Sequence, residues 1–161
     1  MIKFWTYNAD MEYLEELYDR RLRERSDEGI AHEKYALAVG AAPELLEFLR
    51  KSIHTKVEKF KELFPGERIE LRQPATDGST IRVRTNRFPL RVVDLSFKKD
   101  GLTYVKRHQR SRDSQTEIDT GTVYIRADFV RSAYFEYQGK PILDDDLATE
   151  MLRELFEDAS C

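Results

Sequence analysis

The strongest chemical pattern in the chain is a basic stretch in which arginines alternate with apolar residues. Residues 68–112 hold twelve Lys and Arg against four Asp and Glu, a net charge of +8, whereas residues 1–67 carry −3 and residues 113–161 carry −8. Residues 68–72 and 80–84 alternate charged and apolar side chains, which is typical of strands with one face in water. Because strand side chains alternate between faces, four guanidinium groups should share one surface, namely those of Arg68, Arg72, Arg82 and Arg84.

This surface is the candidate binding site. Guanidinium groups form paired hydrogen bonds with carboxylates and phosphates, so we expect an anionic partner. Arg107 lies further along the same basic stretch and joins the four strand arginines as an expected contact residue. The alternative is a solvated face whose arginines pair with Glu70, with Asp94 and with the acidic last third of the chain.

The whole-chain charge bears on the class of partner. The net charge is −3 and the pI is near 5.7, so the average surface does not attract nucleic acid. A protein with an acidic face is therefore the expected partner, and the expected function is that of a small soluble binding protein of the inhibitor, immunity or adaptor type. Two alternatives stay open: a ligand-binding or catalytic domain with a pocket between sheet and helices, and a nucleic-acid-binding protein.

Other residues that could do chemistry fit no catalytic or metal-binding motif. Three consecutive aspartates at 144–146 are typical of a helix start, and three more acids lie in a polar loop. The three histidines are far apart in the sequence. We therefore expect no catalytic residue, no metal and no cofactor from these groups, which are Asp113, Glu117, Asp119, Asp144, Asp145, Asp146, His32, His54 and His108.

Helical patterns dominate the first part of the chain. Residues 1–7 are rich in β-branched and aromatic side chains and favour a short strand. A helix then begins at residue 8 or 10 and ends before the break at 26–29, and an Ala-rich helix covers 30–39. After Gly40 and Pro43, apolar residues recur every three or four positions from Leu46 to Phe64, which predicts the longest helix.

The remainder indicates a sheet followed by one helix. Residues 67–143 should form five or six antiparallel strands, with a bulge at Val92-Val93 and a mobile loop over 109–119. A helix over 144–158 should pack on the sheet. The expected fold class is α+β, and we expect a single domain over 1–161 with a helical part at 8–64.

Composition indicates the compartment. The 161 residues include one cysteine, Cys161, which cannot form an internal disulfide. The apolar runs are too short for a membrane-spanning helix or a secretory signal, which predicts a soluble, cytoplasmic protein without a membrane partner.

Overall fold

A computed structural model describes residues 2–73, 78–129 and 132–159, with side chains from residue 11 onward. The chain forms two compact units, residues 1–36 and 37–161. None of the described helices is both long enough and apolar enough to cross a membrane. The expectation of one domain stays a prediction.

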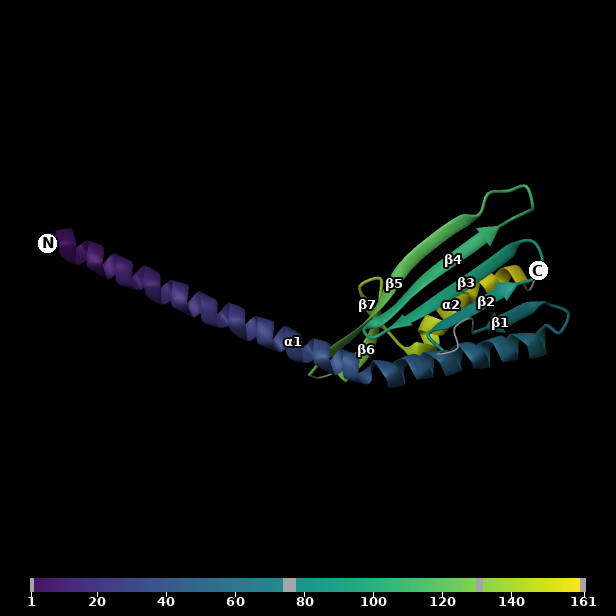
Figure 1. Cartoon of the computed structure of the whole chain (residues 1–161), viewed down its shortest axis with the longest axis horizontal. Helices are drawn as coiled ribbons and strands as arrows, with labels where there is room; N and C mark the ends of the chain where they lie inside the picture. The colour runs from purple at the N-terminus through teal and green to yellow at the C-terminus, as the bar shows by residue number, and fades with distance from the viewer. Residues whose placement is uncertain (1, 74–77, 130–131, 160–161) are drawn as a thin grey trace. The chain divides into compact units, whose positions relative to one another are not determined.

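The second unit contains one sheet whose strands follow in chain order. All neighbouring pairs are antiparallel, so the fold class is α+β, as predicted. The hairpins expected at 68–84 and 90–110 are present (Figure 1). The strands are β1 (Ile69–Arg72), β2 (Thr80–Thr85), β3 (Leu90–Lys98), β4 (Gly101–Gln109), β5 (Glu117–Asp128), β6 (Ser132–Tyr137) and β7 (Lys140–Ile142).

Within the part of the chain that the structure describes, the sheet has seven strands, so the predicted number of five or six is wrong. The additional strand is β7, which contains Pro141 and pairs with β6 through a turn at Gln138 and Gly139. Both turn residues have positive φ, 53° and 77°, as a tight two-residue hairpin turn requires. Proline is tolerated in β7 because this strand lies at the edge of the sheet.

Two further predictions for the sheet are corrected. β5 begins at Glu117, within the expected loop, because its polar residues pair with β4 from His108 onward. The pairing of β3 with β2 and β4 runs without interruption, so there is no bulge at Val92-Val93. The two valines simply alternate: Val93 is buried, while Val92 faces the opposite side and is half-buried.

The first part of the chain forms one helix, α1 (Ile2–Leu63), in place of the predicted strand and three helices. The expected breaks at 26–29 and 40–43 are helical. Ala38 and Ala42 are buried and continue the stripe of Leu46 and Leu49 upstream, so packing supports the helix across Pro43, whose ring lies in an exposed position. Alanine is only weakly hydrophobic, so the sequence pattern predicts that the stripe begins at Leu46, whereas the buried stripe begins at Ala38.

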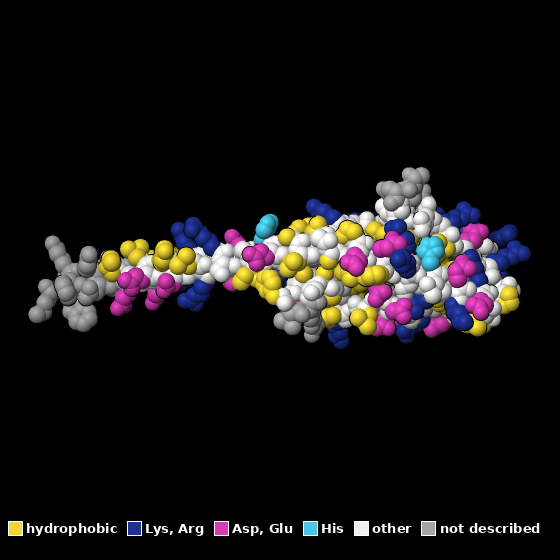
Figure 2. All heavy atoms as spheres, turned by 90° about the horizontal axis from the view of Figure 1, so that it is seen from below, with side chains coloured by type: hydrophobic (Ala, Val, Ile, Leu, Met, Phe, Trp, Pro, Cys, Tyr) yellow, Lys and Arg dark blue, Asp and Glu magenta, His cyan; other side chains and the backbone are white. Residues whose placement is uncertain are grey.

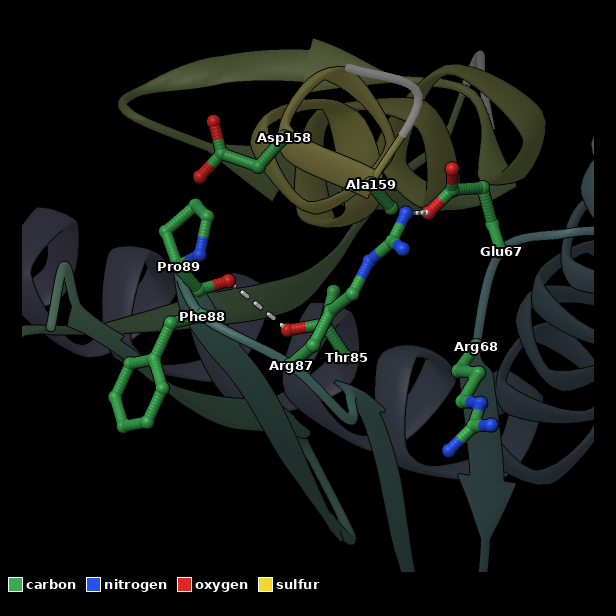
Figure 3. Close-up of a pocket in the computed structure, with 8 residues that line it drawn as sticks. All are labelled: Glu67, Arg68, Thr85, Arg87, Phe88, Pro89, Asp158 and Ala159. Carbon is green, nitrogen blue, oxygen red and sulfur yellow. Dashed lines mark hydrogen bonds and ion pairs between the residues drawn. The ribbon is translucent and has the colours of Figure 1, made fainter. Parts of the chain in front are cut away.

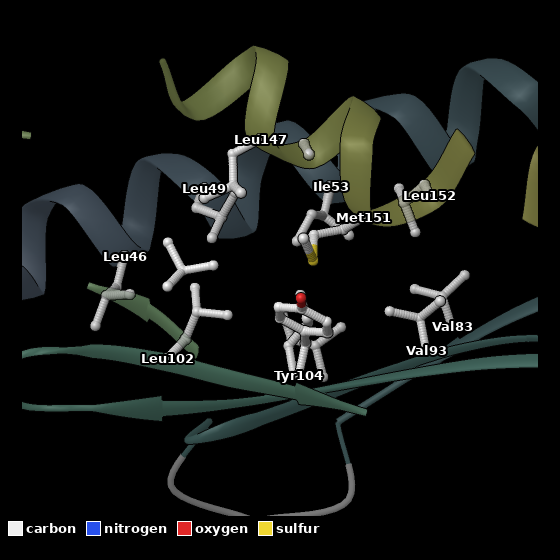
Figure 4. Close-up of a cluster of buried hydrophobic side chains, with 14 of the residues drawn as sticks. Leu46, Leu49, Ile53, Val83, Val93, Leu102, Tyr104, Leu147, Met151 and Leu152 are labelled. Atoms are coloured by element: carbon white, nitrogen blue, oxygen red, sulfur yellow. The ribbon is translucent and has the colours of Figure 1, made fainter. Parts of the chain in front are cut away.

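Residues 37–63 of α1 and the last helix, α2 (Asp144–Ala159), lie on the same face of the sheet (Figure 4). We call this the inner face. Leu49 and Ile53 of α1 and Met151 of α2 are at most 1% exposed and point toward the sheet, where Leu102 and Tyr104 of β4 lie opposite them. Apolar side chains thus fill the space between the helices and the sheet. The helix over 144–158 could be predicted because the apolar residues that it buries recur with the helical period.

The start of α2 is tied to α1 by polar contacts. Ser52, buried on α1, donates a hydrogen bond to Asp145, and Lys56 Nζ lies 3.5 Å from the same carboxylate. The hydrogen bond from Ser52 and the charge of Lys56 lower the pKa of Asp145. The aspartates at 144–146 stand in the first turn of α2, where negative charge is favoured by the helix dipole.

The raised pKa of Tyr137 on β6 predicts that the fold loses stability at high pH. Burial and a hydrogen bond with Tyr104, whose ring centroid lies 6.1 Å away, raise the pKa of Tyr137 to about 12. Because the folded pKa exceeds the ordinary value of 10.0, the neutral phenol stabilises the fold fully below pH 10 and this contribution is lost as pH rises toward about 12. Urea unfolding at pH 9 and pH 11.5 should show a larger loss in wild type than in Tyr137→Phe. An equal loss in both would contradict the assignment.

Candidate functional site: the arginine face

Three of the four arginines predicted to share a surface, Arg72, Arg82 and Arg84, stand together on the outer face of the sheet, opposite the helices. In the register of the strands, Arg72 on β1 lies opposite Arg82 on β2, and Arg82 lies opposite Asp94 on β3. Glu70 stands beside Arg84 in the same β1–β2 ladder. With one further arginine on β4, these groups form a surface that we call the arginine face: Arg72, Arg82, Arg84, Arg107, Glu70 and Asp94.

Asp94 holds two of the four guanidinium groups. Arg82 Nε donates to Asp94 Oδ1 at 2.6 Å and its Nη2 donates to Oδ2 at 3.2 Å. Arg107 Nη1 reaches the same Oδ2 at 2.6 Å from the other side. The hydrogen bonds and the charge of Asp94 raise the pKa of Arg82.

Glu70 holds the other two. Arg84 Nε lies 3.1 Å and Arg72 Nη2 lies 3.0 Å from Glu70 Oε2. Partial burial acts to raise the pKa of Glu70, but the positive charges of Arg72 and Arg84 outweigh it and the pKa falls. The predicted alternative, pairing with Glu70 and Asp94, is therefore present in the structure.

The pairing leaves the face positive and accessible. Four cations against two carboxylates give a charge of +2. The arginine side chains are 61% (Arg72), 42% (Arg82), 39% (Arg84) and 41% (Arg107) exposed, whereas Asp94 is only 20% exposed. Asp94 thus lies lower than the two arginines it holds, whereas Glu70, at 33%, is nearly as exposed as Arg84. Both carboxylates hold guanidinium groups in position, while donors remain available to a partner.

The acidic last third of the chain binds a different arginine. Arg91 Nη1 lies 3.1 Å from Glu154 Oε2, and Arg91 Nε donates to Asp158, both acids being on α2. Arg91 points to the inner face and is 20% exposed. α2 therefore neutralises an inner arginine and leaves the arginine face open.

Arg68 is the predicted contact residue that the structure keeps apart. It precedes β1, is exposed, and lines a hollow of about 130 Å³ with Thr85 and Pro89 (Figure 3). Arg87 pairs with Glu67 in the same place. Among the described residues, Arg68 has no ion pair, so it is a solvated cation at one end of the sheet rather than a member of the cluster.

Apolar side chains complete the arginine face, and the sequence analysis missed them. Val92 stands between Arg84 and Arg107 in the pairing of β2, β3 and β4. Val105 is the partner of Asp94, and Ile118 on β5, 62% exposed, is the partner of Arg107. Strict alternation within residues 90–97 was the signal that would have placed Val92 outside. Apolar groups surrounded by arginines are typical of protein interfaces.

A second, polar hollow of about 380 Å³ lies between β4, β5 and α2. His108 in its wall is 15% exposed, with Nδ1 3.6 Å from Glu117 and Nε2 3.6 Å from Asp158. Lys106 donates to the carbonyl of Glu150 at 3.2 Å, so Lys106 and His108 both have partners within the fold, while Arg110 in the same lining is exposed.

The remaining candidate residues do not converge. His54 contacts Gln73 at 3.2 Å, His108 lies on β4, and His32 belongs to the first unit. Asp113 is exposed in the loop before β5. Within residues 2–73, 78–129 and 132–159, no three His, Cys, Asp or Glu side chains form a cluster able to hold a metal ion.

No family model, curated protein or solved structure matches this chain. The geometry of the arginine face is therefore the basis for a functional assignment.

Proposed function

We propose that this protein is a non-enzymatic binding protein of the cytoplasm and that its arginine face binds an acidic surface of a protein partner. One observation carries the proposal: four guanidinium groups are held by two carboxylates on a face that neither α2 nor residues 37–63 of α1 cover. Fixed side chains lose little conformational freedom on binding, so their hydrogen bonds contribute more to affinity.

The pattern of charge supports a protein rather than a nucleic acid. Glu70 and Asp94 would stand close to any phosphate backbone that lay across the face, and a protein of net charge −3 repels a long polyanion as a whole. A protein surface can place carboxylates against Arg72 and Arg107 and apolar groups against Val92 and Ile118. Arginine is enriched at protein interfaces and among the residues that contribute most to their affinity.

The experiment is a capture assay with purified variants of the full chain. Arg72→Gln with Arg107→Gln removes one cation from each carboxylate group and leaves Arg84 on Glu70 and Arg82 on Asp94. We expect this double variant to recover at least about tenfold less of a protein partner from source lysate than wild type, because two anchors are lost. Circular dichroism would verify that it is folded.

Arg126→Gln is the matched control. Arg126 lies on β5, is 50% exposed and has its own acid, with Nε 3.6 Å from Glu136 Oε1, but it is outside the arginine face. Recovery by this variant should equal that of wild type. Equal recovery by the double variant would refute the proposal, and so would loss of all captured material after nuclease treatment, which would indicate nucleic acid instead.

A further inference from the structure

Residues 11–25 of α1 present an apolar stripe with no partner among the described residues. Met11, Leu14, Tyr18 and Leu22 are spaced by three, four and four positions, which places them on one side of the helix. Their side chains are 43%, 55%, 65% and 47% exposed, and Met11, Leu14 and Tyr18 line a shallow hollow of about 320 Å³. An amphipathic helix normally buries such a stripe.

The charges of the same segment are arranged in two blocks. Residues 11–19 contain four acids and no base, a charge of −4, and residues 20–25 contain four arginines and one glutamate, a charge of +3. In this unit, Figure 2 shows hydrophobic side chains along one side of the helix and acidic side chains along another. The segment therefore has an apolar side and two oppositely charged halves.

We propose that this segment pairs, in antiparallel orientation, with the same segment of a second copy of the chain. A two-fold axis near Tyr18 places residues 11–17 of one copy beside residues 19–25 of the other, so that each acidic half meets a basic half. Packed helices lie about 8–10 Å apart, close to the screening length of about 8 Å at physiological salt, so these charges interact. A parallel pair would set like charges side by side.

The apolar stripe fits the same axis. Tyr18 stands at the centre, opposite Tyr18 of the second copy, and Leu14 comes opposite Leu22 of the second copy, four residues on either side of the axis. The apolar side chains thus lie along the contact while the charges set the direction. This association involves residues 11–25 only and does not depend on the arginine face.

Analytical ultracentrifugation of the full chain between 1 and 200 µM tests the association. We expect wild type to form a dimer of twice 19.0 kDa, and Tyr18→Asn to weaken dimerisation by at least about tenfold. Tyr13→Asn is the matched control, because Tyr13 has a similar exposure of 62% but lies off the stripe. A monomer over the whole range, a trimer, or equal weakening by both variants would overturn the proposal.

Electron spin resonance distances test the direction. A spin label at Glu28→Cys, in a Cys161→Ser background that removes the native thiol, lies ten residues from Tyr18. At 1.5 Å rise per residue, antiparallel copies separate the two labels by about 30 Å along the helix, and parallel copies bring them to about 10 Å. A single short distance would overturn the antiparallel pairing, whereas a long distance together with dissociation at high salt would support it.

Discussion

A Gly101→Ala substitution is expected to lower the free energy of unfolding by about 3–5 kcal/mol, the sum of backbone strain and overpacking. Gly101 begins β4 with a φ of 151°, a conformation that residues with a side chain rarely adopt. An added Cβ would lie 2.1 Å from the carbonyl oxygen of Val123 and 3.1 Å from Cα of Tyr124. Both atoms belong to the backbone of β5, so the strands would have to separate.

Substitutions at two other glycines distinguish the cost of backbone strain from the cost of the steric clash. Gly139 also has a positive φ, 77°, but open space around it, so Gly139→Ala should cost only the strain of about 1 kcal/mol or slightly more. Gly66 has open space and no positive φ, so Gly66→Ala should change stability by less than about 0.5 kcal/mol. Urea denaturation of the three variants measures the series, and equal losses for Gly101→Ala and Gly139→Ala would contradict the predicted clash.

Short-range pattern was sufficient to predict much of the second unit. Strict alternation in residues 80–84 identifies both the strand and the side that each arginine faces, because the strand period of two residues leaves no freedom. The ridges of α2 follow equally from the helical period. In each case the signal lies within one element, and no knowledge of its neighbours is needed.

Long-range packing determined what could not be predicted. Whether Arg107 meets Asp94 depends on the register between β3 and β4, and no property of either residue alone reveals it. The continuity of α1 past Pro43 depends on burial of Ala38 and Ala42, which only the packed structure shows. Glu70 and Asp94 were considered only as neutralising partners, whereas the structure gives them the role of holding four arginines in position.

A Leu152→Ala substitution tests the packing of α2 on the inner face of the sheet. Leu152 is fully buried between α2 and the sheet (Figure 4), and removing three carbon atoms there leaves a cavity that rigid neighbours cannot fill. We expect the free energy of unfolding to fall by about 3 kcal/mol, within the range of about 2–5 kcal/mol for such changes. Urea denaturation followed by circular dichroism measures the difference.

The matched control is Leu143→Ala, which makes the same chemical change immediately before α2. Leu143 is 71% exposed, and its contribution to the helix comes from its backbone carbonyl, which accepts a hydrogen bond from the Leu147 amide at 2.8 Å and is unaffected by the substitution. Its loss should therefore stay below about 0.5 kcal/mol. If Leu152→Ala were equally mild, the side chain of Leu152 would not be packed between α2 and the inner face of the sheet in solution.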